Sequence, residues 1–176
     1  VDFKGPKDAQ EAGIAAVYQH PTSYPHLTVA ENIFMGHEII KHHMIQWKEM
    51  NQEANKYLKE LDADFDATAE MGTLSVAQQQ MVEIAKALST NAKIIILDEP
   101  TVGLDPAQVI GIRKVIRELG KTHTVILSSH ILSEVQAVCQ QVLILSKGRL
   151  VAVGSPEELG ETLNPGSRLR ATAQGE

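Results

Sequence analysis

The spacing of apolar residues changes near position 93. Beyond it, short apolar runs typical of strands alternate with longer segments in which apolar residues recur every three to four positions. Strands are predicted at 93–97, 124–128 and 142–146, and helices at 106–119 and 131–140. This alternation predicts βαβ units and a mainly parallel sheet.

Two short elements are expected after the last of these strands. Residues 150–153 follow a Lys-Gly pair and are predicted to form a hairpin with 142–146. Pro156 is expected to begin a final helix, because proline is favoured at the first helical position. Residues 164–176 carry no apolar periodicity and are predicted to be a disordered tail.

The first ninety residues have a different pattern. An apolar run at 14–18 predicts one buried strand. Thr28 and Glu31 form a capping box, which predicts that a helix begins there. Further helices are predicted at 46–61 and 76–89. Residues 27–90 are therefore expected to be a helical insertion in an α/β fold.

Composition narrows the class of protein. The chain has 176 residues, of which 43% are hydrophobic and 22% charged, as in ordinary globular domains. A net charge of −6 lacks the basic footprint of nucleic-acid binding, so no nucleic-acid partner is expected. The single cysteine excludes an internal disulfide. No secretory signal and no run of the ~20 apolar residues that span a bilayer are present, which suits cytosolic residence.

Asp98 and Glu99 directly follow the strand predicted at 93–97. They are expected at the carboxyl edge of the sheet, where α/β folds bind ligands. A purely structural interpretation is a strand end and a turn that Pro100 enforces. The chemical interpretation assigns Asp98 to Mg²⁺, which prefers one or two carboxylates with phosphate and water oxygens. Glu99 would then polarise an attacking water, since phosphoryl transfer needs an oriented nucleophile.

Other polar positions have two interpretations as well. Ser75 and Gln78 form a second capping box, but a helix N-terminus also suits a phosphate group. His130 follows the strand predicted at 124–128, where an imidazole can donate to a phosphate and position water. A lone histidine is more commonly structural or exposed. Asp105, before Pro106, is a good helix N-cap.

Two segments together resemble motifs of ABC-type ATPases. Leu74-Ser75-Val76-Ala77-Gln78-Gln79-Gln80 resembles the signature sequence, and Lys93 to Thr101 resembles the Walker B motif. Residues 100–106 resemble the family's D-loop, and the resemblance covers 14 to about 160. Residues 27–90 look most like sugar-import ATPases, and 101–160 look more like export-type cassettes. The family usually has two glycines where Val76 and Ala77 stand.

The resemblance implies roles for individual residues. Glu99 would be the general base or water-positioning residue, and His130 the switch histidine at the γ-phosphate. Asp98 and the Q-loop residue Gln19 would be Mg²⁺ partners. The signature and the end of the D-loop would contact the nucleotide held by the opposite subunit. The residues involved would be Ser75, Val76, Ala77, Gln78 and Asp105.

The resemblance also implies a partial P-loop NTPase (RecA-like) parallel sheet with an inserted α-helical subdomain. Four regions are expected: a core strand and Q-loop at 1–26, the helical subdomain with the signature at 27–90, the α/β core at 91–163 and the tail at 164–176. The expected function is that of an ATP-binding subunit of an ABC transporter, which couples ATP hydrolysis to solute transport. A dimeric cassette would bind ATP and Mg²⁺, with a second cassette and transmembrane permease subunits as partners. Its expected location is cytoplasmic, peripheral on the inner face of the cell membrane.

One family motif does not occur in these residues. No Gly-x-x-x-x-Gly-Lys followed by Ser or Thr is present. Gly120-Lys121-Thr122 imitates its end, but Val115 occupies the first glycine position and the segment leads from a helix into a strand. The chain alone is therefore expected to be inactive. Alternatives are a degenerate module that lends its signature face to a complete partner, and a non-transport ABC ATPase.

A pair of histidines could suggest a metal site. His42 and His43 are adjacent, and adjacent side chains diverge on a helix. Since no partner ligand is evident in the sequence, they are predicted to be surface histidines.

Overall fold

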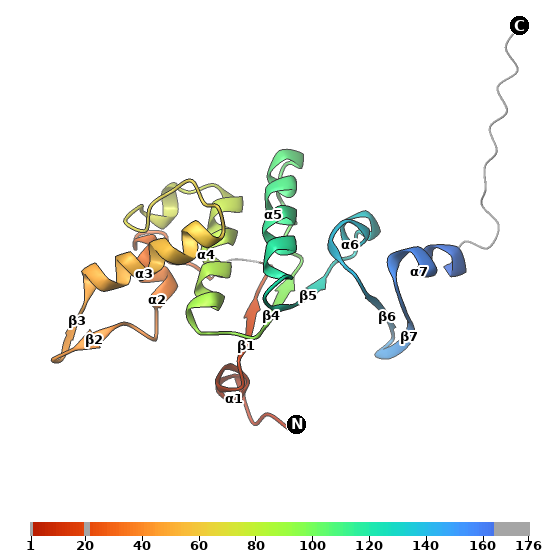
Figure 1. Cartoon of the computed structure of the whole chain (residues 1–176), viewed down its shortest axis with the longest axis horizontal. Coiled ribbons are helices and arrows are strands. Elements are labelled where there is room, and N and C mark those ends of the chain that lie inside the picture. Colours follow the sequence, from red (N-terminus) through yellow and green to blue (C-terminus); the bar gives the residue numbers. More distant parts are fainter. Residues whose placement is uncertain (1, 20–21, 164–176) are drawn as a thin grey trace, which may run out of the picture. The chain divides into compact units, whose positions relative to one another are not determined.

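The computed structural model describes residues 2–19 and 22–163 (Figure 1). The predicted tail at 164–176 lies outside the described residues. The chain divides into two compact units, of which the first ends at His130 and the second begins at Ile131.

A three-stranded parallel sheet forms the centre of the first unit. Its strand order is β1-β4-β5, and the strands are β1 (Ile14–Val17), β4 (Ile94–Asp98) and β5 (Thr124–Ser128). Leu97 is paired with Val17 on one side and with Leu127 on the other. All three strands therefore end at the same edge of the sheet, and the predicted α/β class with a parallel sheet is confirmed.

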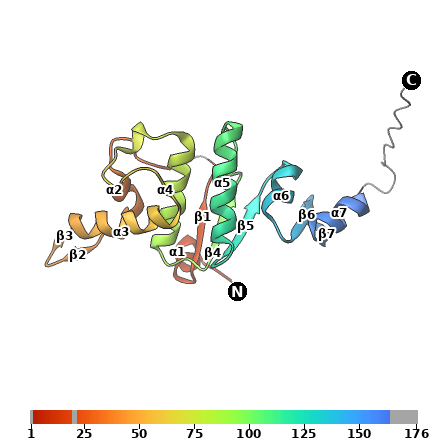
Figure 2. The ribbon, with the colours of Figure 1, turned by 45° about the horizontal axis from the view of Figure 1, so that its top comes forward.

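Helices contact the two outer strands of this sheet. Helices α1 (Pro6–Glu11) and α4 (Val76–Ser89) contact β1, and α5 (Pro106–Leu119) contacts β5; α4 and α5 run beside the strands (Figures 1 and 2). Ile95 and Leu97 are buried, whereas Ile126, whose register partner is Ile96, is 51% exposed. The alternation follows from the pleat, because successive side chains point to opposite faces of a strand.

The segment between β1 and β4 is helical, as predicted. It contains α2 (Val29–Phe34), α3 (Trp47–Glu60), the short 3₁₀ helix η1 (Met71–Thr73) and α4, and its three α-helices contact one another. Both predicted capping boxes, at Thr28 and Ser75, are present. The shared core is apolar and includes Ile33, Met50, Ala54, Leu58 and Ile84.

Two apolar side chains of the helical segment are only partly buried. Trp47, at the first position of α3, is 51% exposed. Met81 is only half-buried, whereas Gln80 and Val82 are buried. Helix α4 packs against α2 and α3 and also against β1, so it buries more of its circumference than the single stripe that periodicity indicates.

His42 and His43 lie in a β-hairpin, not on a helix. Strands β2 (Ile40–Lys41) and β3 (Met44–Ile45) pair antiparallel, and the two histidines form the turn with φ values of 52° and 63°. Positive φ at both central residues is what a tight hairpin turn of the I′ type requires. Both side chains are exposed, as expected.

The second unit contains α6 (Leu132–Val138), a hairpin and α7 (Pro156–Leu163). The hairpin joins β6 (Val142–Ser146) to β7 (Arg149–Gly154), and this predicted pairing is confirmed. In the described residues β6 pairs with β7 alone. Among the described helices, none combines the length and the apolar character that crossing a bilayer requires.

Candidate functional site

Polar residues meet where β4 and β5 end. Asp98 is the last residue of β4, Ser128 is the last residue of β5, and the register places them opposite each other. Glu99 and His130 follow in the connections that leave the same edge. The parallel pairing thus brings together residues about thirty positions apart in the chain.

Glu99 has an unusual backbone conformation. Its φ is 46°, and its backbone N–H donates to the carbonyl of Ser128 at 3.1 Å. A positive φ is uncommon for residues other than glycine, and such strain concentrates at functional sites. The following residue, Pro100, also disfavours the right-handed helical conformation at Glu99. The Glu99 side chain is 22% exposed.

His130 holds the Glu99 carboxylate. Its Nδ1 lies 2.8 Å from Oε1 and 2.7 Å from Oε2 of Glu99. A carboxylate only accepts hydrogen bonds, so Nδ1 must carry the proton in this contact. In the neutral ring, Nε2 then has a lone pair and can accept a second hydrogen bond. The pair therefore combines an oriented carboxylate with an imidazole of defined tautomer.

Asp98 is held from the neighbouring strand. The Ser128 hydroxyl donates to Oδ1 of Asp98, and the Asp98 side chain lies at the exposed edge. In the described residues no group of three or more histidine, cysteine, aspartate or glutamate side chains could hold a metal ion. One exposed carboxylate fits a Mg²⁺ that takes its remaining ligands from phosphate and water oxygens, and does not fit an all-protein metal site.

Gln19 belongs to the same edge of the sheet. It lies two residues beyond Val17, whose register partner is Leu97, and is exposed. This places it at the end of β1 on the side where Asp98 and Glu99 leave β4. Residues 20–21, which follow it, are outside the described part.

The predicted signature residues form the start of α4. Ser75 accepts from the Gln78 backbone at 3.3 Å, and the Gln78 side-chain oxygen accepts from the Ser75 backbone at 2.9 Å. The Gln78 amide also donates to Asp64 at 2.9 Å. Val76 is 49% exposed, whereas Ala77 is 7% exposed. Of the two side chains that replace the family's glycines, only Val76 therefore faces outward.

Asp105 caps α5. One carboxylate oxygen accepts from the backbone N–H groups of Ala107 at 2.9 Å and Gln108 at 3.0 Å. Asp105 is therefore the N-cap of a helix, as the sequence predicts. In the described residues these hydrogen bonds of Asp105 and of the Ser75–Gln78 turn do not reach the cluster of Asp98, Glu99, Ser128 and His130. Ser128 is not among the site residues that the sequence predicts, although its position at the end of the predicted strand 124–128 is a usable signal.

The loop that follows β1 is anchored on the helical region. The Asn32 side chain accepts from the Tyr24 backbone at 2.7 Å and donates to its carbonyl at 3.1 Å. The Gly72 N–H donates to the Pro25 carbonyl at 2.8 Å, and a Cβ on Gly72 would lie 3.0 Å from that oxygen. On α4, Glu83 accepts a backbone hydrogen bond from Thr22. Residues 22–25 are therefore joined to the elements that carry the Ser75–Gln78 turn.

The Glu83 contact predicts a pH-dependent stability. Burial raises the pKa of the Glu83 carboxyl above its usual 4.5, although the Lys86 charge and the Thr22 N–H oppose this. The folded state then binds the proton more tightly than the unfolded state, so stability is lost as pH rises above 4.5. Glu83→Gln stays neutral and should melt at a higher temperature than the wild type at pH 8. This difference should shrink as pH falls toward 4.5.

Thermal melts of the complete encoded protein at several pH values measure this difference in melting temperature. Glu60→Gln, at an exposed position, is the control. A difference between Glu83→Gln and the wild type that stays constant with pH would contradict the expectation.

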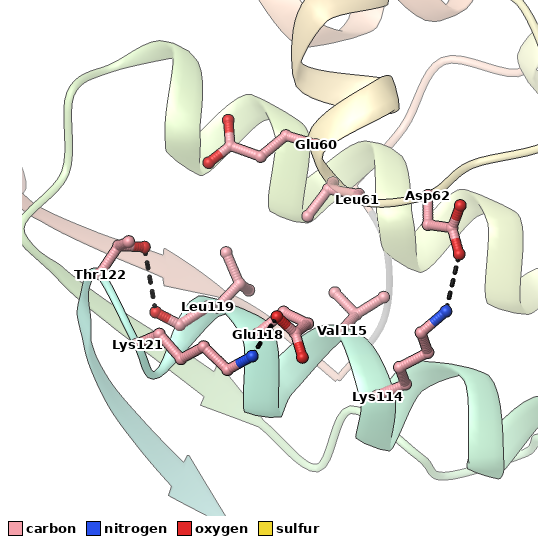
Figure 3. Close-up of a pocket in the computed structure, with 9 residues that line it drawn as sticks. All are labelled: Glu60, Leu61, Asp62, Lys114, Val115, Glu118, Leu119, Lys121 and Thr122. Carbon is pink, nitrogen blue, oxygen red and sulfur yellow. Dashed lines mark hydrogen bonds and ion pairs between the residues drawn. The ribbon is translucent and has the colours of Figure 1, made fainter.

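A pocket of about 240 Å³ lies elsewhere in the first unit (Figure 3). Its lining comes from the end of α3, from α5 and from the turns after them: Glu60, Leu61, Asp62, Lys114, Val115, Glu118, Leu119, Lys121 and Thr122. Ion pairs join Lys114 to Asp62 at 2.8 Å and Lys121 to Glu118 at 2.6 Å. This lining does not include Asp98, Glu99, Ser128 or His130. Lys121, in the segment that imitates a phosphate loop, is instead engaged at the end of α5.

Comparison with protein families and characterised relatives gives a consistent result. The model of the family described as ABC transporter matches residues 3–102. The xylose import ATP-binding protein XylG of Moorella thermoacetica is 42% identical over 156 residues, which are 88% of this chain and 31% of that protein. XylG of Geobacillus kaustophilus is 41% identical over 162 residues, or 92% of this chain and 32% of that protein. The chain thus spans about a third of the length of these relatives.

Solved structures agree with this similarity. An ATP-binding cassette of an ABC transporter superposes with a TM-score of 0.77 at 29% identity, covering 92% of this chain and 68% of the other. The protein cbiO1 of Clostridium perfringens, part of the ABC transporter complex cbiONQ, has a TM-score of 0.72 at 27% identity, covering 90% of this chain and 65% of the other. These likenesses extend over nearly the whole chain.

Proposed function

Since the chain belongs to the ABC transporter family, we propose that it supplies the catalytic carboxylates and the signature turn of an ATP-binding subunit. That subunit couples ATP hydrolysis to the movement of a solute across a membrane. Both named relatives are xylose import proteins, which supports sugar uptake as the process. The chain's own residues support the chemistry, as follows.

Glu99 is the proposed base. Its carboxylate stands at the end of β4 and is oriented by His130, so it can accept a proton from, or align, a water that attacks the terminal phosphate of ATP. Asp98 and Gln19, at the same edge, are the proposed ligands of the Mg²⁺ that accompanies the nucleotide. When bound, this ion neutralises charge on the phosphate oxygens.

The Ser75–Gln78 turn is the proposed contact with a second cassette. The first N–H groups of a helix have no carbonyl partner within the helix, so this helix start suits the phosphates of a nucleotide held by the opposite subunit. Ser75, Val76 and Gln78 would take part, and Ala77 through its backbone because its side chain is buried. Asp105 is proposed to act at the same subunit boundary, through the loop that it ends.

The proposed organisation has the regions that the sequence predicts. Residues 1–26 contain the core strand and the glutamine loop, 27–90 the helical subdomain and 91–163 the remaining α/β core. The proposed partners are a second cassette, as a homo- or heterodimer, and transmembrane permease subunits. The proposed location is cytoplasmic, on the inner face of the cell membrane.

One observation carries the proposal: the Glu99 carboxylate is held by both oxygens against His130 beside Asp98. If this contact orients the base, His130→Ala should lower ATP turnover of the complete encoded protein by about 10²-fold, the lower end of the range for acid–base groups. ATP affinity should change little. Phosphate release at saturating MgATP, with His123→Ala on the strand-entry side of β5 as the control, measures this. If His130→Ala hydrolysed ATP at the wild-type rate, the histidine would have no role in orienting Glu99 for the reaction.

A second candidate is favoured by the missing phosphate-loop motif in these 176 residues. On this hypothesis the chain is a non-hydrolytic module that lends its signature turn to a complete partner. The two candidates differ in the role of Glu99. Substitution of Glu99 would then leave hydrolysis unchanged, whereas substitution at Ser75 would impair hydrolysis by the partner.

A further inference from the structure

Ser128 contacts both carboxylate residues of the site. The register of β4 and β5 places it opposite Asp98, and its hydroxyl donates to Oδ1 of that residue. Its carbonyl accepts the backbone N–H of Glu99 at 3.1 Å. One residue at the end of β5 therefore holds Asp98 through its side chain and Glu99 through its backbone.

We propose that Ser128 is a positioning residue that fixes the Asp98 carboxylate for Mg²⁺. This inference rests on the proposed function. A serine hydroxyl has a single proton to donate. The Leu97 carbonyl is a second possible acceptor but lies 3.4 Å away, so Asp98 is the better-placed partner. With Oδ1 held by the protein, Oδ2 is the oxygen that can face a metal ion.

Burial does not explain this hydrogen bond. Asp98 and Ser128 are both exposed, so water could satisfy either group and no penalty for an unpaired buried atom arises. What the contact changes is the freedom of the Asp98 side chain, which ends a strand and would otherwise sample several rotamers. Outer partners that orient a ligating carboxylate are typically worth 10- to 100-fold in metal affinity or activity.

The two contacts of Ser128 can be separated by substitution. Ser128→Ala removes the hydroxyl and keeps the backbone carbonyl that holds Glu99. Ser128→Thr keeps the hydroxyl and suits a strand. Ser128→Cys has a similar size but is a weak donor, and it serves as the second loss variant if the alanine variant folds poorly. Thr124→Ala is the matched control, since it removes an exposed hydroxyl at the opposite end of β5.

The experiment measures metal affinity in the complete encoded protein. Mn²⁺ replaces Mg²⁺ as the probe, and electron paramagnetic resonance counts free Mn²⁺ in the presence of a non-hydrolysable ATP analogue. We expect Ser128→Ala and Ser128→Cys to bind Mn²⁺ about 10- to 100-fold more weakly. Ser128→Thr and Thr124→Ala should stay close to the wild type, and metal-free affinity for the analogue should be the same in all variants.

Three results would overturn the proposal. Wild-type Mn²⁺ affinity in Ser128→Ala would show that the hydroxyl does not position Asp98. An equal loss in Ser128→Thr would assign the effect to packing at the strand end. A wild-type protein that binds the analogue without Mn²⁺ uptake would remove the metal site itself, and the proposed function would fail with it.

Discussion

Replacing Glu99 by glutamine is expected to lower ATP turnover of the complete encoded protein by about 10²- to 10⁴-fold, the effect of losing an oriented acid–base group. Glutamine keeps the shape of the side chain and can still contact His130, but it has no negative charge with which to accept a proton from water. ATP affinity should be preserved, because Glu99 is assigned to the reaction and not to holding the phosphates. Steady-state phosphate release and equilibrium ATP binding measure the two quantities.

Glu49→Gln is the matched control. Glu49 is a partly exposed glutamate of the same unit, and its ion pair with Lys41 is of the surface kind that contributes less than about 1 kcal/mol. This variant should hydrolyse ATP at the wild-type rate. If Glu99→Gln also kept near-normal turnover, the base would have to be sought at another residue, and the non-hydrolytic hypothesis would gain support.

A polypeptide of these 176 residues by itself is expected neither to hydrolyse ATP nor to bind MgATP with micromolar affinity. The β- and γ-phosphates of ATP are held in phosphate-loop proteins by a nest of backbone N–H groups and a lysine. The corresponding motif does not occur in the chain. Lys121, in the segment that imitates it, pairs with Glu118 at the end of α5.

Isothermal titration calorimetry of the isolated polypeptide and of the complete encoded protein tests this expectation. If only the complete protein bound MgATP, the groups that hold the β- and γ-phosphates would lie outside these 176 residues. Micromolar affinity or steady turnover of the isolated polypeptide would show that the described residues hold the triphosphate themselves. It would then be wrong that Asp98 and Glu99 act on a nucleotide whose phosphates are held by residues outside this chain.

The strand ends of the site could be predicted because the signal is local. An uninterrupted apolar run that stops at Asp98 and Glu99 both defines β4 and places its carboxylates at one edge. The capping boxes at Thr28 and Ser75 are equally local, and both begin helices where expected. Such features depend on residues within four positions of one another, so a single sequence contains them.

Other features depend on contacts that no local pattern contains. The role of Ser128 follows from the register of β4 against β5, which sets it opposite a residue thirty positions earlier. The hairpin at His42 and His43 has strands of only two residues, too short to show alternation. The burial of Gln80 results from packing of α4 on both helices and sheet. In each case tertiary contacts decide the outcome.

The most direct test of the central claim, that Glu99 activates water at this sheet edge, is the identity of the nucleotide that Glu99→Gln retains. The complete encoded protein is incubated with MgATP, separated from free nucleotide, and its bound nucleotide is identified by chromatography. Intact ATP is expected on Glu99→Gln, and ADP on the wild type and on Glu49→Gln. ADP on Glu99→Gln, in the same amount as on the wild type, would contradict it.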